Sequence, residues 1–112
     1  MPENAAVIHK QILRMTNAQI LEVQTFEVPA DAEMVDINWD TRQLDGIAFW
    51  YKISVDEDLE PRYQKTKAWS FYIRRTGNPF PEGCTHMATV VRDVFAWHVL
   101  DADGNNISWA AI

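Results

Sequence analysis

Apolar and polar residues alternate along most of the chain, a period-two pattern that is typical of β-strands. The clearest case is IAFWYKISV at residues 47–55, where every odd-numbered residue is large and apolar. These side chains share one face of a strand, whereas Trp50, Lys52 and Ser54 share the other face. We therefore expect a central strand here, with its odd-numbered face in the core.

Comparable patterns predict strands in six other segments of the chain. They are VIHKQILRM (7–15), QILEVQTFEV (19–28, followed by Pro29), MVDINWD (34–40), AWSFYIRR (68–75), CTHMATVV (84–91) and VFAWHVL (94–100). In the third of them, Val35, Ile37 and Trp39 are expected to share one face. The apolar residues of 7–15 and 84–91 also fit a helical spacing, so a helical alternative stays open for these two segments.

Turn signals separate these segments. VPADAE (28–33) begins a turn at a proline, and TRQLDG (41–46) supplies an Asp-Gly turn, so we expect a hairpin at each. DEDLEPRYQKTK (56–67) is the longest polar connection, and DADGNN (101–106) predicts a tight turn into the apolar tail ISWAAI (107–112). The resulting order is that of a meander.

The length of 112 residues allows one core, so residues 1–112 are expected to form a single domain. Hydrophobic residues make up 47% of the chain and include five Trp, five Phe and three Tyr, which give a short chain a large buried area. The predicted fold class is all-β and mainly antiparallel: a small sandwich or partly open barrel of about seven strands, with little helix. Exposed strand edges and surplus aromatic residues favour a homo-oligomer.

Charge and cysteine usage exclude several classes of protein. Ten Lys and Arg against sixteen Asp and Glu give a net charge of −6, the wrong sign for general binding to a nucleic-acid backbone. A single cysteine, Cys84, excludes an intrachain disulfide. The first residues lack a secretory pattern, and no stretch reaches the roughly 18 apolar residues of a membrane span, so we expect a cytoplasmic protein without membrane contact.

The segment RRTGNPFPEG (74–83) carries the strongest candidate for a binding site. Arg74 and Arg75 are potential forks for an anion, Thr76 supplies a hydroxyl in the tight turn and Asn78 a side-chain amide. The segment lacks the Lys-Ser/Thr ending of a P-loop, and a turn without a ligand is an open alternative. On a regular strand the two arginines would point to opposite faces.

Two aromatic residues are candidates for stacking on a ligand. Phe80 lies within the same segment, and Trp50 shares its strand face with Lys52 and Ser54 rather than with core residues. Trp39, Trp69 and Trp97 alternate with other apolar residues and are expected in the core, according to the same pattern. The alternative for Trp50 is a partly covered outer sheet face.

Catalysis has no support from the sequence, and no cofactor is expected. Cys84 and His86 would point outward in parallel from a strand, and a nucleophile-elbow motif is absent from the sequence. A metal site is a minority hypothesis: if Val90 opposed Val94, His86 would oppose His98, with Cys84 on the same face. A shift of one residue in register would destroy this arrangement.

Several segments together resemble a known family. VIHKQIL, FEVPADAEMVDINW, IAFWYKI, FYIRRTGNPFP, HMATVV and VFAWHVL are similar, in this order, to short phage and prophage proteins classed as a domain of unknown function. The resemblance covers roughly residues 7–101 and rests mainly on the TGNP and WHV motifs at 76–79 and 97–99. Asn78 stands where the family commonly has histidine. The resemblance implies a phage accessory protein in an infected bacterial cell, with no assigned activity.

These observations favour a protein that binds without catalysing a reaction. The first hypothesis is a phage counter-defence protein that sequesters a small anionic, nucleotide-like signalling ligand between protomers. The second is an inhibitor that binds a host immune or replication protein through the acidic loops 31–40 and 56–60. A minor virion or assembly component is a third possibility.

Overall fold

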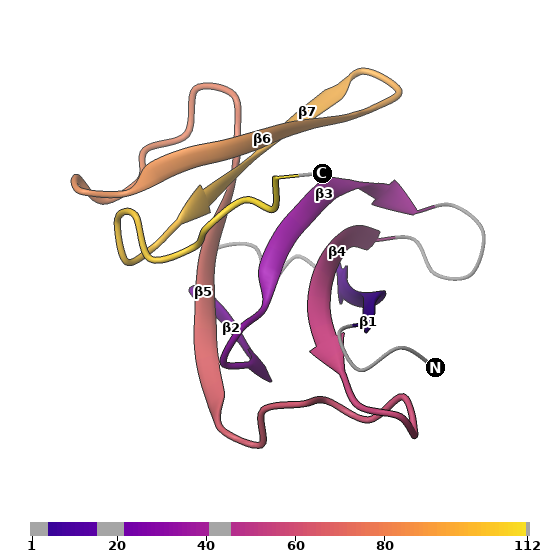
Figure 1. Ribbon diagram of the computed structural model, residues 1–112. Coiled ribbons are helices and arrows are strands. Elements are labelled where there is room, and N and C mark those ends of the chain that lie inside the picture. Colours follow the sequence, from indigo (N-terminus) through magenta and orange to yellow (C-terminus); the bar gives the residue numbers. More distant parts are fainter. Residues whose placement is uncertain (1–4, 16–21, 41–45, 112) are drawn as a thin grey trace.

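The computed structural model describes residues 5–15, 22–40 and 46–111. These residues form seven β-strands and contain no helix, which confirms the all-β class (Figure 1). The strands are β1 (Ala5–Arg14), β2 (Gln24–Pro29), β3 (Glu33–Asp40), β4 (Gly46–Val55), β5 (Thr66–Arg75), β6 (Thr85–Arg92) and β7 (Phe95–Asp101). Since the described part of the chain has no helix, it has none with the length and apolar character of a membrane span.

Two antiparallel sheets make up the fold. The first has the strand order β1-β4-β3 and the second has the order β2-β5-β7-β6. The predicted meander is therefore wrong, because β1 pairs with β4 and β2 pairs with β5. β4 lies in the middle of its sheet, as its sequence predicts. β3 and β6 lie next to each other where the two sheets meet. The arrangement is a small sandwich that is partly closed along one side.

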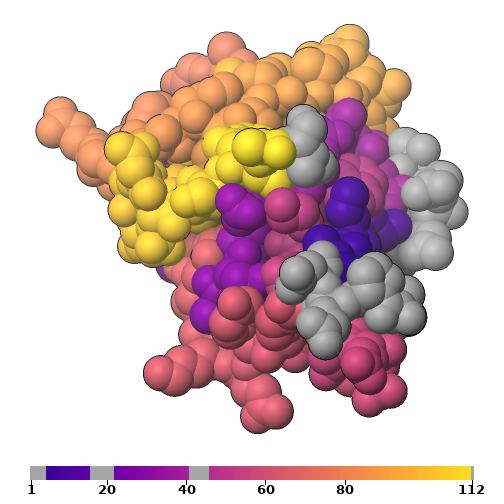
Figure 2. Space-filling model, viewed as in Figure 1, coloured from indigo at the N-terminus to yellow at the C-terminus, as the bar shows by residue number. Residues whose placement is uncertain are grey.

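The C-terminal segment completes this closed side. The Met34 amide donates to the Ser108 carbonyl at 2.8 Å, and the Ala110 amide donates to the Met34 carbonyl at 2.7 Å. Figures 1 and 2 show the segment, in yellow, between β3 and the β6–β7 hairpin. Ile107 inserts its side chain into the core and is 7% exposed. The predicted apolar tail is therefore part of the packed structure.

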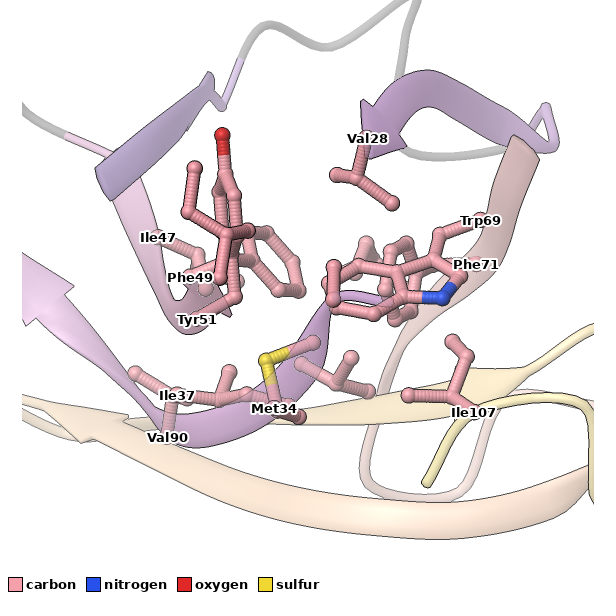
Figure 3. Packing of buried hydrophobic residues seen from close by; sticks show 14 of the residues in the cluster. Val28, Met34, Ile37, Ile47, Phe49, Tyr51, Trp69, Phe71, Val90 and Ile107 are labelled. Carbon is pink, nitrogen blue, oxygen red and sulfur yellow. The ribbon is translucent and has the colours of Figure 1, made fainter. Parts of the chain in front are cut away.

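The core fills the space between the two sheets (Figure 3). The odd-numbered residues of β4 face those of β5, because alternation places one side chain in two on the inner face of each strand. Trp69, Phe49 and Phe71 are the largest fully buried side chains. The ring centroids of Phe49 and Phe71 are 4.6 Å apart, and Phe26 lies 5.3 Å from the first and 5.4 Å from the second. These aromatic rings join one sheet to the other.

Both segments with a helical alternative are strands. β1 pairs with β4 over its whole length, from Ala5 opposite Val55 to Arg14 opposite Gly46. β6 pairs with β7 in the same antiparallel manner. The neighbouring strand satisfies the backbone N–H and C=O groups that a helix would have satisfied internally, so tertiary pairing decides between the two patterns.

The predicted face of β3 is partly wrong because of a β-bulge. The register with β4 shifts between Met34 and Asp36, which leaves Val35 as the extra residue. Met34 is fully buried and Ile37 is 5% exposed, so both enter the core although their positions differ by an odd number. Because of the bulge, even-numbered side chains face the core before Val35 and odd-numbered Ile37 faces it afterwards.

The turn at VPADAE is tight, but the prediction of a hairpin there is wrong. The Ala32 amide donates to the Pro29 carbonyl at 2.9 Å, as in a β-turn. However, β2 pairs with β5 and β3 pairs with β4, so this turn carries the chain from one sheet to the other. The Asp31 carboxylate fixes the crossing, because it accepts a hydrogen bond from the Ser54 amide at 2.9 Å. The predicted turn at 41–46 lies outside the described residues apart from Gly46.

Tyr51 makes the stability of the fold depend on pH in the alkaline range. Burial raises the pKa of its phenol above the ordinary value of 10.0. The folded state therefore keeps a proton that the unfolded chain loses. The stabilising contribution of the Tyr51 phenol is complete below pH 10 and decreases as pH rises through the folded-state pKa. We expect urea unfolding to show a steeper loss of stability above pH 10 in the wild type than in Tyr51→Phe. The exposed Tyr63 provides the control, since Tyr63→Phe should keep the wild-type slope; equal slopes in all three proteins would contradict the expectation.

Candidate functional site

The candidate segment leaves β5 through a tight turn. The Asn78 amide donates to the Arg75 carbonyl at 3.0 Å, which closes a four-residue β-turn. Gly77 has a φ of 92°, a left-handed conformation that side chains with a Cβ rarely adopt. The Thr-Gly pair of the TGNP motif therefore forms the turn that the sequence predicts.

Two side-chain contacts hold the following loop, residues 76–83, against the outward face of the second sheet. The Nε of Arg74 donates to the Pro79 carbonyl at 2.9 Å. Thr76 Oγ1 lies within hydrogen-bonding distance of His98 Nε2, at 2.8 Å. The middle of the loop, at Pro79, is therefore attached to β5, and the start of the loop, at Thr76, is attached to β7.

A hollow of about 210 Å³ lies between this loop and the sheet. Its floor includes Leu100, which points outward from β7 yet is only 2% exposed. Phe80 lines it from the loop and is 49% exposed. The complete lining consists of Arg74, Arg75, Gly77, Asn78, Phe80, His86, His98 and Leu100. An apolar floor with a few polar and cationic groups around it is the usual composition of a small-molecule site.

The structure brings together most of the residues that the sequence singles out for ligand binding. Arg74, Arg75, Asn78 and Phe80 line the hollow, and Thr76 lies beside it through its contact with His98. Their proximity follows from the turn, which folds the loop back over the end of β5.

Trp50 is separated from the other candidates. It lies on β4 in the first sheet, opposite Lys10 and Asp36, and does not line the hollow. Its side chain is half-buried on the outward face of that sheet. Of the two predicted stacking residues, only Phe80 belongs to the site.

The two arginines point to opposite faces of the sheet, as regular strand geometry predicts. Arg74 pairs with His98 on the outward face, and Arg75 pairs with Trp97 on the inward face. The guanidinium of Arg75 lies 4.3 Å from the ring centroid of Phe95 and 5.4 Å from that of Trp97. Arg74 therefore supplies the guanidinium on the loop-covered side, where it also stacks on Tyr72 at 4.9 Å.

The predicted register between β6 and β7 is wrong, and so is the predicted direct opposition of His86 and His98, although the two imidazoles still meet. Val90 pairs with Trp97 rather than with Val94, and His98 pairs with Thr89. A register shift between His86 and Ala88 then places His86 on the outward face together with His98, and His86 Nε2 lies 3.2 Å from His98 Nδ1. The two histidines meet across a bulge and not as a directly opposed pair.

Cys84 does not complete a metal site with these histidines. It precedes the first residue of β6 and is half-buried. Over the described ranges 5–15, 22–40 and 46–111, no group of three or more His, Cys, Asp or Glu side chains is placed to hold a metal ion. The three-ligand arrangement of the minority hypothesis is therefore not formed.

Sequence reasoning missed three parts of the lining: Gly77, Leu100 and the participation of both histidines. The sequence does not show that Leu100 is buried, because an apolar residue on the outward face of a strand is commonly exposed where no loop covers it. From the sequence, His86 and His98 are candidates only as metal ligands, and their place beside the hollow follows from the pairing of β7 with β5 and β6.

The fold and the hollow define a small all-β protein with one loop held over the outward face of a sheet. The chain belongs to a family described as a domain of unknown function (DUF7352), whose model matches residues 4–108. This agrees with the expectation of a family without an assigned activity. Searches of curated proteins and of solved structures gave no match.

Proposed function

We propose that this chain is a non-enzymatic binding protein that holds a small anionic, nucleotide-like ligand in the hollow beneath loop 76–83. The observation that carries the proposal is the convergence of Arg74, Asn78 and Phe80 on one hollow with an apolar floor. A guanidinium and an amide can donate hydrogen bonds to a phosphate, and an exposed aromatic ring can stack on a base.

The size of the hollow limits what it can enclose. A volume of about 210 Å³ is below the roughly 300–1,000 Å³ of pockets that enclose drug-sized ligands. It accommodates a single ring or a phosphate group, so the rest of a nucleotide extends over the surface near Phe80. The proposal therefore includes a homo-oligomer in which a second protomer covers that part and completes the site.

The biological setting is part of the proposal. The resemblance to phage and prophage proteins supports a phage-encoded counter-defence role in the cytoplasm of an infected bacterium, where the ligand would be a signalling nucleotide withdrawn from a host defence system. A fold alone does not determine a function, so this setting follows from the resemblance.

Native mass spectrometry of protein purified from phage-infected cells tests the proposal. We expect a small mass retained per chain, and Arg74→Glu should raise its dissociation constant roughly tenfold or more and so lower its occupancy, because a charge-assisted hydrogen bond contributes about 1.5–3 kcal/mol. Phe80→Ala should weaken retention with little effect on folding, since its ring is half-exposed. Arg14→Glu makes the same charge change on β1 in the other sheet and should retain the mass.

Two further results separate loss of binding from loss of structure. Thermal unfolding of Arg74→Glu identifies a folding defect, and Arg74→Lys keeps the charge but loses the guanidinium fork. Equal retention by the wild type and a folded Arg74→Glu, or a bare chain from infected cells, would overturn the proposal.

A host-protein inhibitor is the second candidate, and one observation in loop 56–60 favours it. Asp56 Oδ1 accepts hydrogen bonds from the Asp58 and Glu60 amides at 2.9 and 3.1 Å, which fixes the loop. The loop presents Leu59, 53% exposed with a φ of 63°, among acidic side chains. An apolar residue in a preorganised acidic loop suits a basic partner surface. Capture of a host protein that Glu57→Lys releases and Arg74→Glu does not would favour this candidate.

The other acidic loop contributes less to that candidate. Asp31 accepts the Ser54 amide, Lys10 Nζ lies 2.7 Å from the buried Asp40 carboxylate, and Glu33 pairs with Lys52 at 3.6 Å. These carboxylates have partners within the chain, and residues 33–40 form β3 rather than the acidic loop that the sequence predicts, so segment 31–40 serves the fold.

A further inference from the structure

Three side chains on the outward face of β6 and β7 place their donor atoms in a nearly regular triangle. His86 Nε2 lies 3.2 Å from His98 Nδ1 and 3.1 Å from Thr89 Oγ1, and the third edge, from Thr89 Oγ1 to His98 Nδ1, is 3.2 Å. His86 and Thr89 are exposed and His98 is half-buried. The triangle borders the hollow and is accessible to a small solute.

These distances fit a tetrahedral transition-metal site. Zn–N bonds of about 2.0–2.1 Å in tetrahedral coordination set neighbouring donor atoms about 3.3 Å apart. The separation of 3.2 Å between His86 Nε2 and His98 Nδ1 is close to that value. A metal ion above the triangle would therefore bind both imidazoles with only small movements of the rings.

A second contact orients one of the two ligands. His98 Nε2 lies 2.8 Å from Thr76 Oγ1. When Nε2 carries the ring hydrogen and donates it to the threonine oxygen, Nδ1 presents its lone pair toward His86 and Thr89. An outer hydrogen bond that fixes the tautomer and the orientation of the ring is the usual support of a histidine ligand. In that tautomer, the contact from the start of loop 76–83 orients His98 so that its Nδ1 can bind a metal.

We propose that His86 and His98 bind a divalent transition-metal ion of the Zn²⁺ type, with Thr89 Oγ1 at the third corner. Imidazole nitrogen is a preferred ligand of zinc, copper and nickel. Two imidazoles alone, opposite the cationic Arg74, make a site of moderate affinity whose remaining positions are filled by solvent or an anion. The site does not depend on the nucleotide-binding proposal.

Co²⁺ titration of the purified chain tests this site, because Co²⁺ replaces Zn²⁺ and its tetrahedral complexes absorb visible light. We expect a visible band that saturates, that Zn²⁺ displaces, and whose midpoint rises roughly tenfold or more in His86→Ala and in His98→Ala. His9 is the third histidine of the chain and lies on β1 in the other sheet, so His9→Ala is the matched control and should leave the titration unchanged.

Two other variants complete the test. Cys84→Ser should bind Co²⁺ as the wild type does, since the proposed ligands are histidines. Arg74→Glu should bind at least as tightly, because it removes a positive charge beside His98, and this distinguishes failure of the metal site from failure of the anion site. Because His86 is exposed, we expect His86→Ala to fold, and circular dichroism can verify this.

The proposal is overturned by any of three results. They are an absence of Co²⁺ and Zn²⁺ binding up to about 1 mM, equal binding by the wild type and a folded His86→Ala, or a loss of binding in Cys84→Ser that neither histidine variant reproduces.

Discussion

Truncation of Phe71 to alanine is expected to lower the free energy of unfolding by about 3–5 kcal/mol. Phe71 is fully buried on β5, and its ring lies 4.6 Å from Phe49 of the other sheet and 5.4 Å from Phe26. Alanine removes the apolar contact area and leaves a cavity between two rigid sheets, which can close only in part. Because small domains have only about 5–15 kcal/mol of stability, the variant would lose a large fraction of it.

Urea unfolding followed by tryptophan fluorescence measures this loss as a shift of the midpoint. Phe80→Ala deletes the same atoms at a position that is 49% exposed and should change the free energy of unfolding by only about 0.5 kcal/mol. Similar losses for the two variants would mean that Phe71 does not join the sheets as described.

Asp101→Ala is the second change with a large expected effect, about 2–4 kcal/mol. Asp101 is 1% exposed, and its two carboxylate oxygens accept hydrogen bonds from the Asp103 amide at 3.0 Å and the Ile107 amide at 2.9 Å. Alanine leaves both amides without this acceptor, and the one at Ile107 is buried. Since Ile107 enters the core, the C-terminal segment would also separate from β3.

Two related variants define the size of this effect. Asp101→Asn keeps one acceptor oxygen and should lose an intermediate amount, whereas Asp103→Ala removes an exposed carboxylate and should be nearly neutral. Hydrogen exchange at the Met34 and Ala110 amides should accelerate in Asp101→Ala, because both belong to the contact between β3 and the tail. Unchanged exchange there would contradict the proposed role of Asp101.

The strands could be predicted because apolar and polar residues alternate along a strand that has one buried face and one exposed face. Residues 47–55 show an unbroken alternation and form the central strand of a sheet, with Ile47, Phe49 and Ile53 in the core. The assignment of strands to sheets was not predictable in the same way. Nothing in VPADAE indicates that its turn changes sheets, because turn chemistry is local and the pairing of β2 with β5 depends on residues some 40 positions apart.

The candidate site, too, could be predicted only in part from the sequence. Arg74, Asn78 and Phe80 are close in sequence, and the Thr-Gly turn brings them onto one hollow. The contribution of the histidines depends on a bulge between His86 and Ala88. A single extra residue reverses which face the side chains occupy, and the sequence carries no clear signal for its position.

The order of strands also determines how the protein is made. β1 is the first strand in the sequence, but its partner β4 begins only at Gly46. Topologies dominated by such distant pairs fold slowly, on a scale of milliseconds to seconds. At a synthesis rate of about 5–20 residues per second, β1 leaves the ribosome seconds before β4 can pair with it. During that interval Val7, Ile12 and Leu13 have no sheet to join, so translation is the stage at which this strand is most open to aggregation.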